Sequence, residues 1–370
     1  MNCALIHDWL IGMRGGEKVL EEICGLFPGS DIYTLFYVPE NISPFIRNHT
    51  INQSFLQKIP GALKKYRYFL PLFPLAVRSF HLSNVDAVIS ISHCVAKGIR
   101  VSPDIPHFCY CLTPMRYIWD NYDAYFASSH SPLPIRASMK LVRPYLKRWD
   151  VASSRRVDYF ISISKFVARR IKDYYGRDSE VIHPPVNTAF FISDSSIPRD
   201  EYYLIVSALV PYKKIDIAVL TFNKLTNKKL KIVGVGPEYN RLIRLRNHNN
   251  IEFIGRISDE RLRSLYQGAK ALIHCGEEDF GIAMVEAQAC GTPVIAFNRG
   301  GAAEIVNDGV TGILFSEQST ESLTNAIDSV NNKTFDYANL RKQALRFSGE
   351  MFRQKFYQYI MSRLGRGTTT

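Results

Sequence analysis

Short apolar runs alternate with amphipathic stretches along the whole chain, and a polar or glycine-containing turn follows each run. The runs have the length of buried strands, and the stretches between them have helical periodicity. The first run, Cys3–Ile6, precedes the glycine turn Gly12–Gly16 and a helix predicted from Glu17 to Leu26. The other predicted strands are 86–92, 107–112, 158–163, 203–208, 230–233, 252–254, 271–274 and 293–297. Strands that alternate with helices predict parallel sheets with right-handed crossovers.

Two adjacent prolines interrupt this alternation near the middle of the chain. They follow His183 and stop any regular element, and the alternation restarts near residue 203. A chain of 370 residues is also longer than one ordinary hydrophobic core requires. We therefore expect an α/β protein of two Rossmann-like parallel-sheet domains that face each other across a deep cleft. The expected domains are 1–190 and 191–345, followed by a helix over 346–364 that packs back on the first domain.

The cysteines and the charge limit the classes of protein to consider. Seven cysteines are scattered through apolar runs without a CxxC pair, which favours reduced core residues in a cytoplasmic protein. The formal net charge of +12 indicates an anionic partner. The first ten residues predict a strand rather than a signal peptide, and no run has the roughly twenty apolar residues of a spanning helix.

Basic side chains gather in two stretches of the first half. In the earlier stretch they are interleaved with the aromatic and aliphatic residues of Tyr66–Phe73, which form either a membrane-seating patch or the buried side of a helix. This mixture favours a peripheral position on the anionic inner face of the plasma membrane over nucleic acid, for which no motif is visible. A solvated helix surface is the third interpretation. The basic residues are Lys58, Lys64, Lys65, Arg67, Arg78, Arg136, Lys140, Arg143, Lys147, Arg148, Arg155, Arg156, Lys165, Arg169, Arg170 and Lys172.

The segment 276–293 carries the most informative chemistry. Gly281 permits a tight turn into a helix that is predicted to end near Cys290. The unpaired N–H groups at such a helix start suit a phosphate or a sugar hydroxyl. Glu278 lies on the loop before this helix and Glu286 lies within it, and we expect both to face one binding site. The alternative interpretation is a solvent-exposed helix start that is enriched in acidic residues.

The spacing Glu278-x7-Glu286, together with segments spread over nearly the whole chain, resembles the retaining family 4 glycosyltransferases with the GT-B fold. The segments are HDWLIGMRGGEKVLE, CYCLTPMRYIWD, SALVPYKKIDIAV, VGVGPE, FIGRISDE and CGTPVIAFNRGGAAEIV. The chain is especially similar to bacterial mannosyltransferases of O-antigen and exopolysaccharide assembly. The resemblance implies a hexosyltransferase that moves mannose from GDP-mannose to a lipid-linked or oligosaccharide acceptor in surface polysaccharide biosynthesis. We expect no metal and no cofactor, because no DxD motif is present and the nucleotide sugar is a co-substrate.

The resemblance also implies roles for individual residues. Glu278 would lie beside the transferred sugar, and Lys213 would neutralise the leaving diphosphate, so these two are the expected catalytic residues. Glu286 would bind the ribose hydroxyls of the donor. The other expected donor-binding residues are Gly15, Gly16, Lys214, Gly255, Arg256, Phe280, Gly281 and Ile282. The further candidates for the site are His93, Arg116 and Arg299.

Two positions depart from the pattern of the family. Leu112 stands where relatives carry a histidine that contacts the donor sugar, and Ala208 stands where they carry an arginine beside the diphosphate. A second hypothesis is therefore a catalytically weak or silent GT-B subunit that binds a sugar nucleotide or a partner enzyme. A third is a sugar-nucleotide epimerase or a phosphorylase of the same fold. His7 and Asp8 resemble a catalytic pair, although such residues often only hold a turn, and His274 is expected to pack at a strand end.

Overall fold

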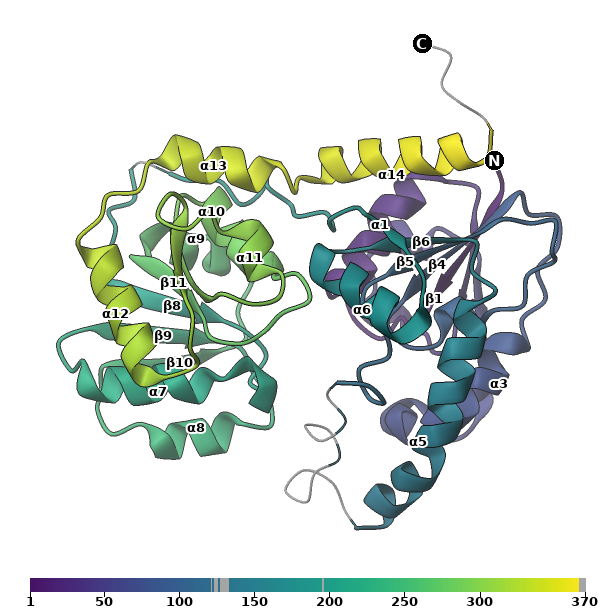
Figure 1. Ribbon diagram of the computed structural model, residues 1–370, viewed down its shortest axis with the longest axis horizontal. Helices are drawn as coiled ribbons and strands as arrows, with labels where there is room; N and C mark the ends of the chain where they lie inside the picture. The colour runs from purple at the N-terminus through teal and green to yellow at the C-terminus, as the bar shows by residue number, and fades with distance from the viewer. Residues whose placement is uncertain (121, 123–125, 127–132, 195, 366–370) are drawn as a thin grey trace. The chain divides into compact units, whose positions relative to one another are not determined.

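The computed structural model describes residues 1–120, 122, 126, 133–194 and 196–365, without the side chains of residues 64, 65, 134 and 135. The predicted basic residues Lys64 and Lys65 therefore lie outside the described side chains. The chain forms two compact units, of which the first comprises Met1–Pro185 and the C-terminal segment from Phe352, and the second comprises Val186–Met351. Each unit is a parallel sheet with helices packed around it (Figure 1).

The sheet of the first unit has seven strands in the order β3-β2-β1-β4-β5-β6-β7, and all neighbours are parallel. Every residue of β1, β4 and β5 is buried, as is typical of central strands covered on both faces. The strands are β1 Cys3–His7, β2 Asp31–Thr34, β3 Ile51–Gln53, β4 Ala87–Ser92, β5 His107–Cys111, β6 Tyr159–Ser162 and β7 Ser179–Val181. The chain order reverses between β1 and β4, so the carboxyl ends of these two central strands form a topological switch point.

The helices of the first unit include one from the end of the chain. In α14, Phe352 and Phe356 lie against the ring of Tyr110 on β5, with ring centroids 5.7 Å and 5.9 Å away. The apolar face of the C-terminal helix therefore covers the sheet of the first unit. The helices are α1 Gly15–Leu26, α2 Pro44–Arg47, α3 Phe73–Arg78, α5 Leu133–Ser154, α6 Lys165–Tyr175 and α14 Gly349–Arg363, and the short 3-10 helices are η1 Pro39–Asn41, η2 Phe55–Lys58, η3 Leu63–Leu72 and η4 Ala96–Gly98.

The sheet of the second unit has six parallel strands in the order β10-β9-β8-β11-β12-β13. The order reverses between β8 and β11, so these adjacent strands form the switch point of the second sheet. The strands are β8 Tyr202–Val206, β9 Lys229–Val233, β10 Ile251–Gly255, β11 Ala271–His274, β12 Val294–Phe297 and β13 Gly312–Phe315. The helices are η5 Pro211–Lys213, α7 Ile215–Lys224, α8 Tyr239–Leu245, α9 Asp259–Gly268, α10 Ile282–Ala289, α11 Ala302–Ile305, α12 Thr320–Asn331 and α13 Tyr337–Leu345.

The boundary between the units is marked by backbone pairing. The N–H of Val186 donates to the carbonyl oxygen of Phe347 at 2.9 Å, and this hydrogen bond joins the two segments in which the chain passes from one unit to the other. The second unit comprises Val186–Met351. The domain predicted from the sequence was 191–345. Among the described residues, none of the helices combines the length and the apolar character needed to cross a bilayer.

Candidate active site

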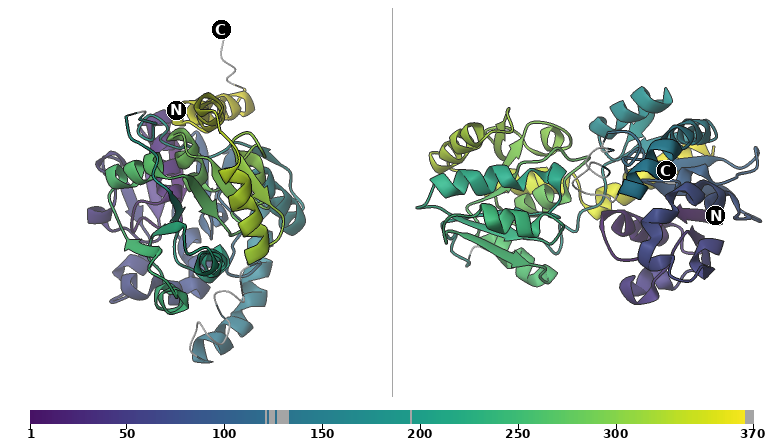
Figure 2. Two further views of the ribbon diagram at one scale, coloured as in Figure 1. Left: turned by 90° about the vertical axis from the view of Figure 1, so that its left-hand side faces the viewer. Right: turned by 90° about the horizontal axis from the view of Figure 1, so that it is seen from below.

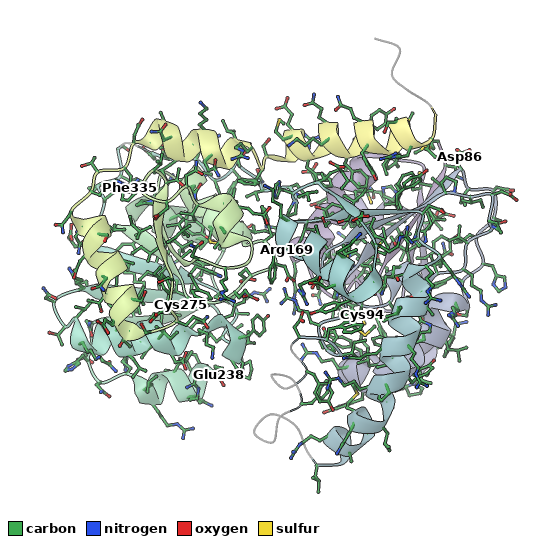
Figure 3. All side chains as sticks on the ribbon, in the orientation of Figure 1. Asp86, Cys94, Arg169, Glu238, Cys275 and Phe335 are labelled. Atoms are coloured by element: carbon green, nitrogen blue, oxygen red, sulfur yellow. The ribbon has the colours of Figure 1, made fainter. Side chains whose placement is uncertain are left out.

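Two loops meet at the switch point of the second unit. The loop after β8 continues into η5 and carries Lys213, and the loop after β11 carries Glu278. Cys275, labelled in Figure 3, begins the second of these loops. Because β8 and β11 are neighbours in the sheet, residues far apart in the sequence lie together at its carboxyl edge. Open parallel sheets bind their ligands at this position.

Lys213 and Glu278 form an ion pair between Nζ and Oε1. Their side chains are 12% and 14% exposed, so the pair is largely but not completely withdrawn from solvent. The two loops touch, because a Cβ added to Gly276 would lie 2.8 Å from the Cα of Lys213. An ion pair in such surroundings interacts more strongly than one on the open surface. The structure thus brings together the two residues that were expected to be catalytic.

The loop that carries Glu278 is also held by the glycines that follow β12. The N–H of Gly301 donates to the carbonyl oxygen of Glu278 at 2.8 Å. Gly300 adopts a left-handed backbone with φ of 68°, and a Cβ there would lie 2.2 Å from the same carbonyl oxygen. Only glycine fits this close approach. The Gly300-Gly301 pair therefore holds the backbone of Glu278 in place.

His274 is a neighbour of the ion pair that the sequence interpretation missed. Its Nε2 lies 3.5 Å from Oε1 of Glu278, at the long limit of a hydrogen bond. Burial, reinforced by the charge of Lys213, lowers the pKa of His274 to about 3. The imidazole is therefore neutral at physiological pH and adds no charge to the pair. Its position at the end of β11, four residues before Glu278, was the available signal.

Helix α10 begins next to this loop. Gly281 precedes it with φ of 111°, a conformation that glycine tolerates, and no side chain caps the helix. The N–H of Met284 donates to the carbonyl oxygen of Gly281 at 3.0 Å, so the N–H groups of Ile282 and Ala283 are the ones at this helix start that are suited to an anion or a hydroxyl. The side chain of Phe280 is buried against the ring of Phe347, with centroids 5.4 Å apart, so this side chain packs inside the chain. The backbone roles expected of residues 280–282 stay predictions.

Glu286 has a strong partner inside the second unit. Its side chain is 7% exposed, and Oε2 accepts a hydrogen bond of 3.0 Å from the hydroxyl of Tyr266 on α9. Burial, together with the charge of Glu286, raises the pKa of Tyr266 well above its usual range, so this hydroxyl stays protonated and donates. One carboxylate oxygen is thus fixed in direction. The role of Glu286 toward the ribose diol of the donor, which the resemblance implies, stays a prediction.

The remaining predicted residues of the second unit lie on loops at the carboxyl edge of the sheet. Lys214 is exposed with φ of 52° and begins α7, and Gly255 ends β10 with φ of 80°. Arg256 and Arg299 are exposed on the loops after β10 and β12. Within the described part of the chain, none of these four residues forms a hydrogen bond or an ion pair with Lys213 or Glu278.

In the first unit, Gly15 and Gly16 open helix α1 at the carboxyl end of β1. A Cβ at Gly16 would lie 2.9 Å from Cδ1 of Leu112 and 3.3 Å from Nε2 of His7. The requirement for glycine here therefore comes from packing inside the chain as well as from any ligand. Leu112, which replaces the histidine of relatives, lies directly against this glycine.

Asp8 holds the turn after β4. Its carboxylate is fully buried and accepts hydrogen bonds of 2.6–2.9 Å from the four backbone N–H groups of residues 93–96. Nδ1 of His93 lies 3.1 Å from Oδ2 of Asp8. Burial lowers the pKa of His93 despite the carboxylate, and the positive charge of Arg116 lowers it further. His93 and Arg116 therefore lie in electrostatic range of each other at the switch point of the first unit.

Glu17 gives this region a pH dependence. Burial raises the pKa of Glu17 to about 7, although its Oε2 accepts the N–H of Arg14 at 3.0 Å. In the unfolded chain it ionises near its ordinary pKa of 4.5, so its contribution to stability is complete below pH 4.5 and is lost as the pH rises to 7. We expect Glu17→Gln, whose amide oxygen still accepts that N–H, to raise the free energy of unfolding by roughly 2–3 kcal/mol at pH 8.

The measurement is thermal or urea unfolding of wild type and variant at pH 5 and pH 8. The difference between them should be small at pH 5, where the wild-type carboxyl is largely protonated in the folded protein. The matched control is Glu21→Gln, one turn further along α1 and half-exposed, which should show no such pH dependence. An equal effect of Glu17→Gln at both pH values would contradict the assignment.

Two family models match the chain, one in each half. Residues 15–190 match the model described as Glycosyltransferase Family 4, and residues 188–347 match that described as Glycosyl transferases group 1. A glycosyltransferase of Methanocaldococcus jannaschii, described as uncharacterized, is 29% identical over 204 residues, which cover 54% of this chain and 55% of that protein. A D-inositol 3-phosphate glycosyltransferase of Mycobacterium tuberculosis is 31% identical over 184 residues, or 44% and 38% of the two chains. The chain thus spans about half the length of these relatives, or less.

Solved structures of similar proteins show the same fold over almost the entire chain. Sucrose-phosphate synthase from Thermosynechococcus elongatus is 18% identical with a TM-score of 0.71 and 99% coverage of both chains. An Anabaena protein in complex with UDP and glucose is 18% identical with a TM-score of 0.69, covering 97% of this chain and 99% of that one. A lipopolysaccharide outer core galactosyltransferase is 16% identical with a TM-score of 0.68, covering 98% and 100%. The chain therefore belongs to the glycosyltransferases of the GT-B fold, with a family 4 domain in its first half and a group 1 domain in its second.

Proposed function

We propose that the protein is a hexosyltransferase that moves a sugar from a nucleotide-sugar donor, retains its anomeric configuration and needs no metal ion. The observation that carries this proposal is the ion pair of Lys213 and Glu278 at the switch point of the second sheet, beside the uncapped start of α10. A cation, a carboxylate and the first amides of a helix are the groups that an activated sugar would require. Because these groups lie together in one place, the proposal is supported by the local arrangement of side chains as well as by the fold.

The proposed step breaks the bond between the anomeric carbon and the diphosphate. Negative charge develops on the leaving oxygens, and the ammonium of Lys213 and the amides of α10 would stabilise it. Fixed donors of this kind contribute roughly 2.7–4 kcal/mol each in a site that excludes water. Positive charge develops on the sugar ring, where the carboxylate of Glu278 would oppose it. In the family mechanism the leaving phosphate helps to deprotonate the incoming hydroxyl, so no protein base is assigned.

The donor we propose is GDP-mannose, on the strength of the sequence resemblance. UDP-sugars are the main competitors, because one protein of the same fold was solved with UDP and glucose. A thermal-shift panel of GDP-, UDP- and ADP-sugars tests both. A donor present at about 100 times its Kd would stabilise the protein by about 2.7 kcal/mol. The absence of any shift at millimolar concentration would contradict the proposed activity.

The acceptor we propose is a lipid-linked or oligosaccharide glycan of a bacterial surface polysaccharide, reached from the cytoplasmic side of an anionic membrane. NMR of the product decides the stereochemistry through the one-bond coupling between the anomeric carbon and its proton, which distinguishes α- from β-mannosides and so shows whether the anomeric configuration of the donor is retained. Addition of EDTA decides the metal dependence, and we expect unchanged rates. An inverted product, or activity restored only by a divalent cation, would contradict these parts of the proposal while leaving the donor site intact.

A second candidate function is a silent subunit that binds a sugar nucleotide without transferring the sugar. It is favoured by Leu112, which packs against Gly16, and by the exposed Ala208, because both replace polar groups of the family. Under this hypothesis the wild-type protein binds donor but neither transfers nor hydrolyses it. The double variant Leu112→His with Ala208→Arg should then acquire hydrolysis or transfer. Measurable turnover by the wild-type protein would exclude the silent subunit.

A further inference from the structure

Helix α5 has apolar residues on two faces, and only one of them serves the core. Met139, Leu146 and Trp149 are at most 5% exposed and belong to the core of the first unit. On the other face, Leu141 is 82% exposed and Tyr145 is 52% exposed, and the two lie one helical turn apart. Figures 1 and 2 show that the first turns of α5 extend away from the sheet of this unit. The second apolar face therefore needs another explanation.

All charged side chains that accompany the outer face of α5 are cationic. Lys140 and Arg148 are exposed beside Leu141 and Tyr145. The sequence of 133–149 contains three further basic residues, Arg136, Arg143 and Lys147, and no aspartate or glutamate. The first acid of the helix, Asp150, is fully buried, where it pairs with Lys97 and accepts hydrogen bonds of 2.8 Å from Trp119 and Tyr175. The exposed face thus combines leucine and tyrosine with positive charge alone.

The neighbouring helix α3 contacts α5 on its core side, because the guanidinium of Arg78 packs on the ring of Trp149 with 5.7 Å to the centroid. Leu75 of α3 and Tyr68 of η3 are exposed as well, at 61% and 58%. We call four exposed residues of helix α5, which are Lys140, Leu141, Tyr145 and Arg148, the α5 surface.

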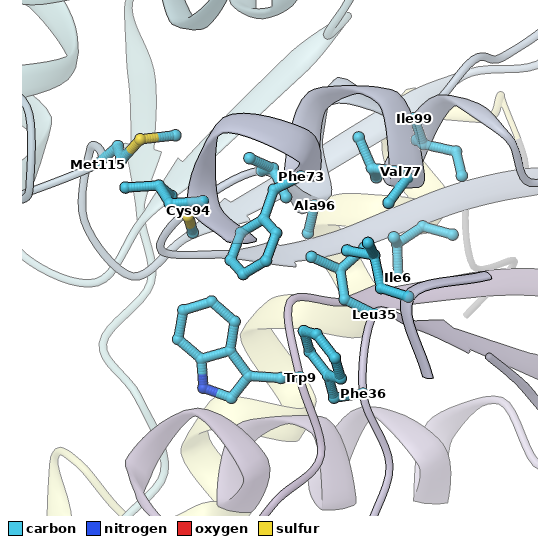
Figure 4. Packing of buried hydrophobic residues seen from close by; sticks show 14 of the residues in the cluster. Ile6, Trp9, Leu35, Phe36, Phe73, Val77, Cys94, Ala96, Ile99 and Met115 are labelled. Carbon is cyan, nitrogen blue, oxygen red and sulfur yellow. The ribbon is translucent and has the colours of Figure 1, made fainter. Parts of the chain in front are cut away.

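The α5 surface differs from the patch that the sequence indicated. Within Tyr66–Phe73, Leu70 and Phe73 are buried, and Phe73 packs against Trp9 and Phe36 with ring centroids 6.1 Å and 6.0 Å away (Figure 4). Much of that segment is therefore the buried side of a helix. The most exposed leucine of the first unit instead lies on α5, at Leu141.

We propose that the α5 surface seats the protein on an anionic lipid bilayer. Cations beside exposed leucine and tyrosine match the two layers of such a surface, because the cations meet the headgroups while the apolar side chains enter the boundary with the acyl chains. Nucleic acid is bound through cations and stacking aromatic rings, so it would not account for the exposed side chain of Leu141. A second copy of this chain would bring like charges together. This proposal adds a membrane partner to the proposed function. It rests on that function in one respect, because a lipid-linked acceptor is the reason that the enzyme would need a membrane.

The test is co-sedimentation of the full chain with vesicles of phosphatidylcholine alone and of phosphatidylcholine mixed with phosphatidylglycerol. We expect binding to the mixed vesicles and a loss of at least about tenfold in Leu141→Glu and in the pair Lys140→Gln with Arg148→Gln. The matched control is Leu220→Glu on α7 of the second unit, where the leucine is 40% exposed, and it should bind like wild type. Equal binding by Leu141→Glu and wild type would overturn the proposal.

Two further measurements keep each outcome decisive. Equal unfolding temperatures show that the variants fold, and nucleotide-sugar stabilisation in the same samples shows whether the donor site is intact. Donor binding without vesicle binding refutes the α5 surface but not the proposed function, whereas vesicle binding without donor binding refutes the function alone. If the wild-type protein is retained on duplex DNA and both sets of variants reduce this retention equally, the partner of the α5 surface is nucleic acid rather than a bilayer. If light scattering shows a dimer that Leu141→Glu dissociates, the partner is a second copy of the chain.

Discussion

Replacement of Lys213 by methionine is expected to lower kcat for sugar transfer by about 100- to 1,000-fold. Methionine keeps much of the length of the side chain but removes the ammonium that would stabilise the leaving diphosphate. The loss should appear in kcat more than in KM if the ammonium acts mainly on charge that develops in the transition state. Steady-state kinetics with the donor that the thermal-shift panel identifies provide the measurement.

Lys214→Met is the matched control for this variant. Lys214 is the next residue and carries the same charge, but it is exposed and does not contact Glu278 in the described structure. We expect at most a few-fold change in kcat, with any larger effect in the KM for the donor, because Lys214 is among the expected donor-binding residues. Equal losses in both variants would show that the general positive potential of the loop matters, rather than the position of the Lys213 ammonium.

A double variant separates two roles that Lys213 has in the structure. Because Lys213 neutralises Glu278, the single variant also leaves a largely buried carboxylate without its partner. Lys213→Met combined with Glu278→Gln removes that unpaired charge. If Lys213 only balanced Glu278, the double variant would recover stability and would be as active as Glu278→Gln alone. We expect it to recover stability but to be less active than Glu278→Gln, because the diphosphate would still lack its cation.

The fold was predictable from the sequence wherever strands are long and apolar. The run 271–274 coincides with β11, and the helix expected after Gly281 is found as α10, ending at Ala289. By contrast, β2, β3, β7 and β13 were not predicted. β3 and β7 have three residues each, none of them fully buried, so they carry little of the hydrophobic pattern by which strands are recognised. β2 and β13 have four residues each, which is the lower limit at which an apolar run is recognised as a strand.

The sequence named candidate residues for the site, whose roles stay predictions, but it could not supply their contacts. The family pattern named Lys213 and Glu278, yet only the sheet order, which places β8 beside β11, makes them neighbours. The role of His274 depends on the distance between its ring and Glu278, which no spacing rule supplies. Similarly, the family gives Gly16 a ligand-facing role, and the structure adds its contact with Leu112. Short-range pattern thus identifies chemistry, while long-range pairing decides which groups can act together.

The second large effect is expected in stability, from Asp8→Ala. Removal of the carboxylate leaves the four backbone N–H groups of residues 93–96 without their acceptor in a region that is largely closed to water. Each orphaned buried donor costs about 1–3 kcal/mol, and local relaxation limits the sum. We expect the free energy of unfolding to fall by roughly 3–5 kcal/mol, near the upper end for single substitutions. Urea unfolding followed by circular dichroism provides the measurement.

Two further variants test this prediction, Asp8→Asn as an intermediate change and Asp104→Ala as a control. Asparagine keeps one acceptor oxygen but turns an N–H₂ group toward backbone donors, so we expect a loss of stability between those of wild type and Asp8→Ala. Asp104 is an exposed loop residue of the same unit, and its replacement should change little. The comparison also decides between the two interpretations of the His7-Asp8 pair. An Asp8→Ala protein that unfolds like wild type but has lost transfer activity would place Asp8 in the reaction. Loss of stability in the order alanine, asparagine, wild type would instead assign it to the turn that supports His93.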